Sequence, residues 1–254
     1  MLLPSIGAFV PPPNLAFSAI AAVQVSSVIA TLANSGAAQA PYSKFALDVK
    51  LDKPIPSKIG MLLIYSPATA YSLYALLNST VASVTLIPLL LAHFTKRIFE
   101  VLFVHKYSGD TSLPLASLIG IYYALMSALI VSTPATLTNP TMQTIGLALF
   151  GVGFSGNFFH HVLLSNLRKE IKSEEKHVMP VSGLFNYAAA PHYMFELIGW
   201  LGIGLTSQSL NGMLVFATMT SYLGERAKAQ NAWNLEKWGE KWGENKKNMV
   251  PGIW

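Results

Sequence analysis

The chain has 254 residues, of which 52% are hydrophobic and only 11% are charged. A soluble domain carries roughly a quarter charged residues, so this composition excludes an ordinary soluble protein and indicates a polytopic membrane protein. The absence of cysteine excludes disulfide bonds, thiolate nucleophiles and cysteine-ligated metals. The net charge of +5 does not indicate a nucleic-acid-binding protein, because the basic residues are sorted by membrane side.

Seven apolar segments of about twenty residues, the length that crosses a bilayer core, follow one another along the chain. We expect them at 15–38, 59–77, 81–105, 115–132, 141–165, 184–206 and 209–225. Pro67 lies inside the second segment and predicts a kink there. The fold class expected is therefore all-α integral membrane, with seven transmembrane helices in one bundle (15–225), a short lead (1–14) and a C-terminal tail (226–254).

Lysine and arginine occur only in alternate connections between these segments. The linker before the second segment, the end of the third, the stretch RKEIKSEEKH after the fifth and the tail all carry them, and the intervening connections carry none. With seven crossings, all 17 Lys and Arg residues fall on one side of the membrane or in helix ends that open onto it. The positive-inside rule then places the N-terminus outside or lumenal and the tail on the inner side.

The third segment ends in HFTKRIFEVLFVHKYSG, which carries charge at membrane depth. His93, Lys96, Arg97 and Glu100 recur at three- and four-residue spacing, so they share one face of a helix. One interpretation is an internal ion pair between Lys96 and Glu100, with the basic side chains reaching toward the inner surface. The other is a functional pocket lined by the same face.

The fifth and sixth segments add polar faces of their own. Asn157, His161 and Arg168 share a face in GNFFHHVLLSNLRK, and His192 and Glu196 stand four residues apart in APHYMFELIGW. A metal site would need a third ligand from His93 or His161, and such spacing is common by chance. We therefore expect no metal and favour a pocket that hydrogen-bonds a polar ligand.

Basic residues near these faces favour an anionic ligand. Arg97, Arg168 and Arg226 carry guanidinium groups, which bind phosphate bidentately. The tail alternates Trp233, Trp238 and Trp242 with Lys and Glu, a pattern typical of a helix anchored at a membrane surface. We expect this tail to lie on the inner face and to close the pocket from that side.

Four stretches together resemble a known family. HFTKRIFEVLFVHKYSG, SGNFFHHVLLSNLRK and GLFNYAAAPHYMFELIGWLG are similar to segments of the steroid 5α-reductase and trans-2-enoyl-CoA reductase family. The tail, from RAKAQNAWNLEKWGE to VPGIW, resembles the ending of the plant steroid reductases, and the stretches YSKF and IPSKIGMLLIYSP fit the start. The matches run in the family's order over residues 42–254.

The resemblance implies seven membrane helices and an NADPH pocket that opens to the cytosol. It implies reduction of a lipid carbon–carbon double bond conjugated to a carbonyl, in an enoyl thioester, a sterol enone or a polyprenol-type substrate. It also implies the endoplasmic reticulum, with another organelle membrane such as the mitochondrial inner membrane as the alternative. The positions that match the family's cofactor-binding residues are Arg97, Asn157, His161, Arg168, His192, Glu196, Arg226, Asn231 and Asn234.

The family's catalytic positions are altered. The family holds the substrate carbonyl with a Glu and a Tyr, and the matching residues here are Tyr65 and Phe94. No acid occurs between Lys53 and Glu100, and a phenylalanine cannot donate a hydrogen bond. Tyr65, or His93 beside Phe94, is the candidate replacement donor.

Two hypotheses remain open at this point. In the first, the chain is an NADPH-dependent lipid reductase with an altered donor, whose partners are the bilayer and its lipid substrate. In the second, it is a reductase-fold pseudoenzyme that serves as a structural subunit beside other membrane subunits, holding lipid or nucleotide passively. A transporter fits less well, because the sequence lacks a paired repeat of broken helices.

Overall fold

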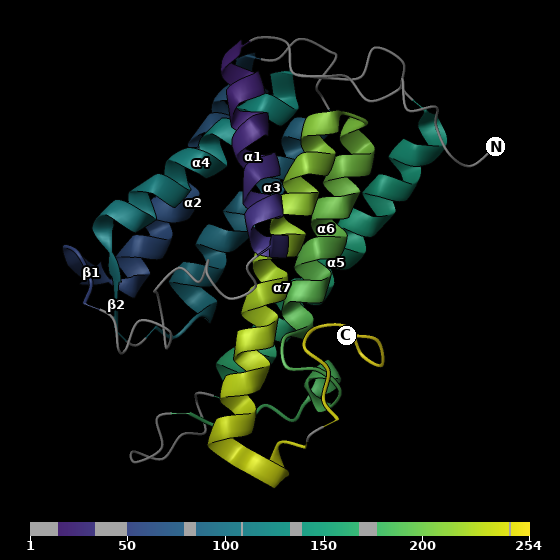
Figure 1. The fold of residues 1–254 in the computed structure, drawn as a ribbon. Coiled ribbons are helices and arrows are strands. Elements are labelled where there is room, and N and C mark those ends of the chain that lie inside the picture. Colours follow the sequence, from purple (N-terminus) through teal and green to yellow (C-terminus); the bar gives the residue numbers. More distant parts are fainter. Residues whose placement is uncertain are drawn as a thin grey trace.

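The computed structural model describes residues 15–33, 50–78, 85–107, 109–132, 139–167, 177–243 and 245–254. Within these ranges every expected apolar segment contains an α-helix (Figure 1). The helices are α1 (Leu15–Ala33), α2 (Ser57–Asn78), α3 (Leu86–Phe99), α4 (Leu113–Ser132), α5 (Pro140–Leu167), α6 (Pro191–Ser207) and α7 (Leu210–Trp238). The helical fold is thus confirmed.

Three of these helices, α2, α4 and α5, are long and apolar enough to cross a membrane, judged on the residues that the structure describes. Pro67 lies inside α2, which stays helical on both sides of it. Seven crossings and an inner position for the tail stay predictions.

The structure differs from the expected boundaries at three places. Helix α6 begins only at Pro191, after a 3₁₀ turn at Gly183–Asn186. Helix α7 continues to Trp238, so the division expected at residue 225 falls inside one helix, whose lower half projects from the bundle in Figure 1. A short antiparallel ribbon joins β1 (Pro54–Pro56) to β2 (Asp110–Ser112) and holds the starts of α2 and α4 side by side.

Helices α5 and α6 approach each other closely through small residues. A Cβ atom added to Gly153 would overlap the backbone of Gly199 and lie 2.6 Å from its Cα atom. A Cβ atom on Gly202 would lie 2.5 Å from the backbone nitrogen of Phe150. Small residues let membrane helices pack backbone to backbone, so the polar residues farther along α5 are set directly against those of α6.

A second contact, between the end of α6 and the start of α5, also holds the two helices in register. Gln208 has a left-handed backbone (φ 48°) where α6 turns into α7, and its side-chain amide bonds both backbone groups of Asn139. Those two bonds measure 2.8 Å to the Asn139 nitrogen and 3.0 Å to its oxygen. The Asn139 side chain in turn caps the start of α5 through the backbone nitrogens of Thr141 and Met142.

The C-terminal segment folds back onto the chain that enters α6 (Figure 1). Ala189 and Ala190 donate backbone hydrogen bonds of 2.8 and 2.9 Å to the carbonyls of Lys247 and Asn248. Asn231 on α7 donates to the Lys246 carbonyl at 3.0 Å and accepts from Trp242 Nε1 at 2.8 Å. Asn231 therefore anchors this segment.

We predict that Gly153→Ala destabilises the protein by about 1–3 kcal/mol, because the added methyl group forces α5 away from the backbone of α6. The measurement is the thermal unfolding midpoint in detergent micelles. Gly151→Ala is the matched control on the same helix, since a Cβ atom there meets nothing within 4 Å. Equal midpoints for the two variants would contradict the close packing.

Candidate active site

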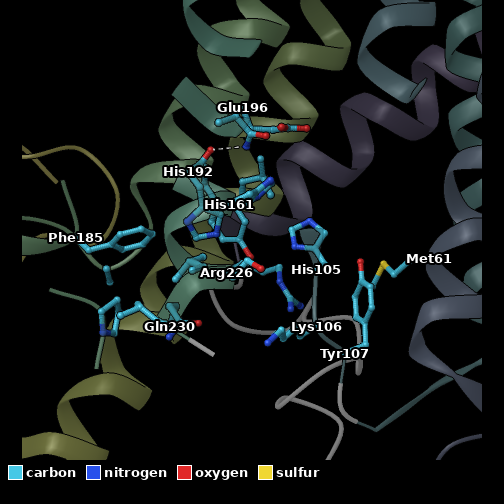
Figure 2. A pocket seen from close by; sticks show the side chains of 18 of the residues that line it. Met61, His105, Lys106, Tyr107, His161, Phe185, His192, Glu196, Arg226 and Gln230 are labelled. Atoms are coloured by element: carbon cyan, nitrogen blue, oxygen red, sulfur yellow. Dashed lines mark hydrogen bonds between the residues drawn. The ribbon is translucent and has the colours of Figure 1, made fainter. Parts of the chain in front are cut away.

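A cavity of about 330 Å³ lies at the end of the bundle where α7 projects. It is lined by the start of α2, the ends of α3 and α5, the start of α6 and the lower part of α7. Figure 2 shows His161, His192 and Arg226 around the middle of this space, with His105 opposite them and Met61 and Tyr107 to one side. The volume is within the usual range for small-molecule sites.

The carboxylate of Glu100 is the centre of a buried polar network beside the cavity. It is fully buried and accepts from Lys96 Nζ at 2.9 Å and from Arg97 Nη1 at 2.6 Å. His161 Nδ1 lies 3.0 Å from the same carboxylate, and His105 Nε2 lies 3.8 Å away. The expected pair between Lys96 and Glu100 is confirmed, and the functional interpretation of the same face is compatible with it.

A widened turn brings these groups together. After Phe99 the helix passes into a π-helical turn at Glu100–Val104, which His105 closes by donating its backbone N–H to the Glu100 carbonyl at 2.6 Å. The hydroxyl of Ser165 on α5 donates to the Val104 carbonyl at 2.6 Å. Such turns occur often at functional sites, and here the turn sets the His105 ring 4.7 Å from the His161 ring.

Arg97 joins this network to the cavity wall. Its Nη2 donates a 2.8 Å hydrogen bond to the phenolic oxygen of Tyr65 on α2, and its guanidinium carbon lies 4.9 Å from the Tyr65 ring centre. Arg97 and Tyr65 both line the cavity. A cation and a phenol therefore face the same space, with Glu100 behind them.

Lys96 points instead toward the contact between α5 and α6. It donates to the side-chain oxygen of Asn157, whose amide nitrogen donates to the His192 carbonyl at 2.9 Å (dashed in Figure 2). Asn157 and His161 both line the cavity, as their spacing predicted. The chain Glu100, Lys96, Asn157 and His192 links α3 to α6 through α5.

His192 and Glu196 on α6 also line the cavity. The buried Nδ1 atom of His192 has no hydrogen-bond partner among the described residues. This atom is shielded from the cavity as the side chain stands, so a ligand reaches it only if the ring turns. Glu196 lies 3.5 Å from His93 Nε2.

The three candidate catalytic residues differ in their access to the cavity. Tyr65 lines the cavity, but among the described residues that form its wall neither His93 nor Phe94 is found. Phe94 is fully buried, with Tyr123 and Trp200 ring centres 5.6 and 6.2 Å away. The centres of the His93 and Trp200 rings lie 4.7 Å apart. Only Tyr65 can touch a molecule in the cavity as the side chains stand.

Of the remaining candidates for cofactor binding, some line the cavity and others do not. Arg226 and Asn234 on α7 are buried and line the cavity, and Asn234 accepts from Gln230 at 2.6 Å. Asn231 points to the C-terminal segment instead. Arg168 lies outside the described residues.

Several cavity residues were not predicted from the sequence. They are Ser57, Met61, Tyr107, Tyr123, Phe185 and Gln230. Tyr123 carried a usable signal, since a tyrosine inside an apolar segment brings a hydroxyl that needs a polar partner. Gln230 lies inside α7 beyond the apolar segment that the sequence predicted, and the others lie in connections or near helix starts, where spacing does not define a face.

A metal ion does not suit this network. Glu100, His105 and His161 hold potential ligand atoms within 4.8 Å of one another. Both oxygens of Glu100, however, already accept from Lys96 and Arg97, whose positive charges oppose a further cation. The cluster is better described as an ion-pair network.

We predict that Glu100→Gln destabilises the protein by about 3–5 kcal/mol, because it leaves two buried cations without their carboxylate. Thermal unfolding in detergent measures the change. The control is Glu236→Gln, which removes the same charge from an exposed site on α7. A Glu100→Gln variant as stable as this control would contradict the structural role of the network.

Comparison with known proteins agrees with the motifs. The family model described as 3-oxo-5-alpha-steroid 4-dehydrogenase matches residues 114–254. A very-long-chain enoyl-CoA reductase of Dictyostelium discoideum is 27% identical over 165 residues, 63% of this chain and 54% of that protein. A 3-oxo-5-alpha-steroid 4-dehydrogenase 1 of Rattus norvegicus is 39% identical over 118 residues, 46% of this chain and 44% of that protein.

A steroid 5-alpha-reductase of Solanum lycopersicum is 32% identical over 110 residues, 43% of this chain and 42% of that protein. The chain thus spans about half the length of the curated relatives it matches. The apolar helices and these matches together indicate an integral membrane protein. The chain belongs to the 3-oxo-5-alpha-steroid 4-dehydrogenase family.

Proposed function

We propose that this chain is an NADPH-dependent reductase of a lipid carbon–carbon double bond conjugated to a carbonyl. Candidate substrates are an enoyl thioester, a sterol enone or a polyprenol-type lipid, taken from the bilayer at the endoplasmic reticulum or another organelle membrane. The observation that carries the proposal is the Arg97–Tyr65 pair, a cation bonded to a phenol at the wall of a cavity. Relatives named as enoyl-CoA and steroid reductases support the same chemistry.

The cavity residues fit a phosphate-bearing dinucleotide. Arg97 and Arg226 offer guanidinium groups for phosphate oxygens, and Gln230 and Asn234 offer amides for sugar hydroxyls. When bound, NADPH supplies the hydride for the β-carbon of the substrate.

Tyr65 is then the group that handles the substrate carbonyl. Hydride addition at the β-carbon places negative charge on the carbonyl oxygen, and a preorganised donor stabilises that charge. The hydrogen bond from Arg97 uses a lone pair of the Tyr65 oxygen and not its proton, so it polarises the phenol as a donor. Glu100 holds the guanidinium in place from the other side.

Apolar side chains also line the cavity. They are Met61, Met219 and Leu223, with the ring of Tyr123, from α2, α4 and α7. The same space therefore offers apolar contacts beside its polar groups. These contacts support a lipid as the substrate class.

The alternative is a pseudoenzyme that acts as a structural subunit of a larger membrane complex. It is favoured by Phe94, which stands where the family has a phenol and fills a buried aromatic cluster with Tyr123 and Trp200. Under this alternative the protein co-purifies from its native membrane with other subunits. A protein that runs alone after mild detergent extraction and oxidises NADPH would rule it out.

We predict that the purified protein binds NADPH and that Arg226→Gln weakens this binding about 10- to 100-fold, the effect of losing a hydrogen bond from a charged group. Binding is followed by NADPH fluorescence, and oxidation by absorbance with a trans-2-enoyl-CoA and a 3-oxo-4-ene steroid. Lys228→Gln, an exposed charge on the same helix, is the control and should bind normally. Wild-type protein that neither binds nor oxidises NADPH would refute the proposed function.

A further inference from the structure

Three aromatic rings from three helices lie next to one another at the edge of the cavity, around the positions that the reductase resemblance assigns to the substrate carbonyl. They are Tyr65 on α2, Phe94 on α3 and Tyr123 on α4. The rings of Tyr65 and Tyr123 are nearly parallel, at an angle of 11° with centres 6.1 Å apart. The Tyr123 ring also lies 5.6 Å from that of Phe94.

Tyr123 stands in front of Phe94 as seen from the cavity. Tyr65 and Tyr123 line the cavity wall, whereas Phe94 is fully buried behind them. A ligand in this region therefore meets a phenol from α4 at the place where α3 offers only a hydrocarbon ring. Tyr123 was not among the residues that sequence motifs singled out.

The fold fixes Tyr123 opposite Tyr65. Helices α2 and α4 come close at Gly120, where an added Cβ atom would overlap the Leu63 carbonyl and lie 3.3 Å from Pro67. The ribbon between β1 and β2 ties the starts of the same two helices. The stacked pair is thus set by a close helix contact.

Tyr122, the residue before Tyr123, points in a different direction and does not reach the cavity. Tyr122 points toward α1, where its hydroxyl accepts a 3.3 Å hydrogen bond from Gln24 Nε2. Tyr122 is not part of the cavity wall among the described residues. One phenol of this consecutive pair therefore serves the helix packing, and the other faces the cavity.

We propose that Tyr123 is a further catalytic residue, whose hydroxyl donates a hydrogen bond to the substrate carbonyl oxygen together with that of Tyr65. This inference rests on the proposed reductase function. Two neutral donors from α2 and α4 then replace the acid and phenol that the family places on the second and third helices. Both hydroxyls keep their protons in this step and act by stabilising the oxygen's charge as hydride from NADPH reaches the β-carbon. The enolate that forms then takes a proton from water at its α-carbon.

The test compares kcat/KM for an enoyl-CoA or an enone in Tyr123→Phe, with Tyr122→Phe as the matched control one position along the helix. Loss of a preorganised donor should lower kcat/KM of Tyr123→Phe about 100-fold. NADPH affinity and the thermal midpoint should stay at the wild-type values, because the ring that packs against Tyr65 and Phe94 is retained. Tyr122→Phe should keep wild-type activity.

A second variant separates catalysis from packing. Tyr123→Leu removes the ring as well as the hydroxyl and should lower the thermal midpoint far more than Tyr123→Phe, because the packing against Tyr65 and Phe94 is lost. Wild-type turnover with an unaffected Tyr123→Phe variant would overturn this inference and leave the proposed function standing. Wild-type protein that does not oxidise NADPH would overturn both.

Discussion

The buried carboxylate of Glu100 is the constraint on which the rest of the site depends. Two cations, Lys96 and Arg97, leave water only because this carboxylate lies within 2.9 Å of each. An unpaired charge at such depth is strongly unfavourable, so the three side chains form a unit. Each cation also reaches other helices, Lys96 through Asn157 on α5, and Arg97 through Tyr65 on α2 and His161 on α5. One acid thereby orders the parts of three helices that border the cavity.

The close packing of α5 and α6 connects the Glu100 network to the cavity residues on α6. Gly153 and Gly199 let the two backbones touch, and the hydrogen bond from Asn157 to the His192 carbonyl continues the contact toward the cavity. His161 and His192 come to face the same space as Arg97 because of that contact. A bulkier interface would separate the arginine from the α6 residues by the width of a side chain. The chemistry of the site therefore depends on residues that have no polar group.

The sequence predicted those parts of the structure that follow helical periodicity. Apolar length predicted the seven helices, and four-residue spacing predicted the pair of Lys96 with Glu100. The π turn after Phe99 breaks that periodicity, which is why the approach of His105 to His161 could not be read from spacing. Tyr123 was missed for a different reason: its partners come from two other helices, and single-segment patterns carry no information about such contacts. The continuation of α7 past residue 225 was missed because a helix can leave the apolar region without a sequence break.

The replacement of an acid by Tyr65 is compatible with the network around it. A carboxyl group at this position would lie beside Arg97, which already pairs with Glu100, and the two acids would compete for one guanidinium unless one stayed protonated. A phenol is neutral near pH 7, so it accepts a bond from Arg97 without disturbing the existing ion pair. Phe94 is then not in itself a sign of lost chemistry, since a donor is defined by where its oxygen lies and not by the helix that carries it. The proposed reduction requires a pair of well-held hydroxyls at the substrate carbonyl, and stacking of Tyr65 on Tyr123 across α2 and α4 holds two such rings at the cavity wall.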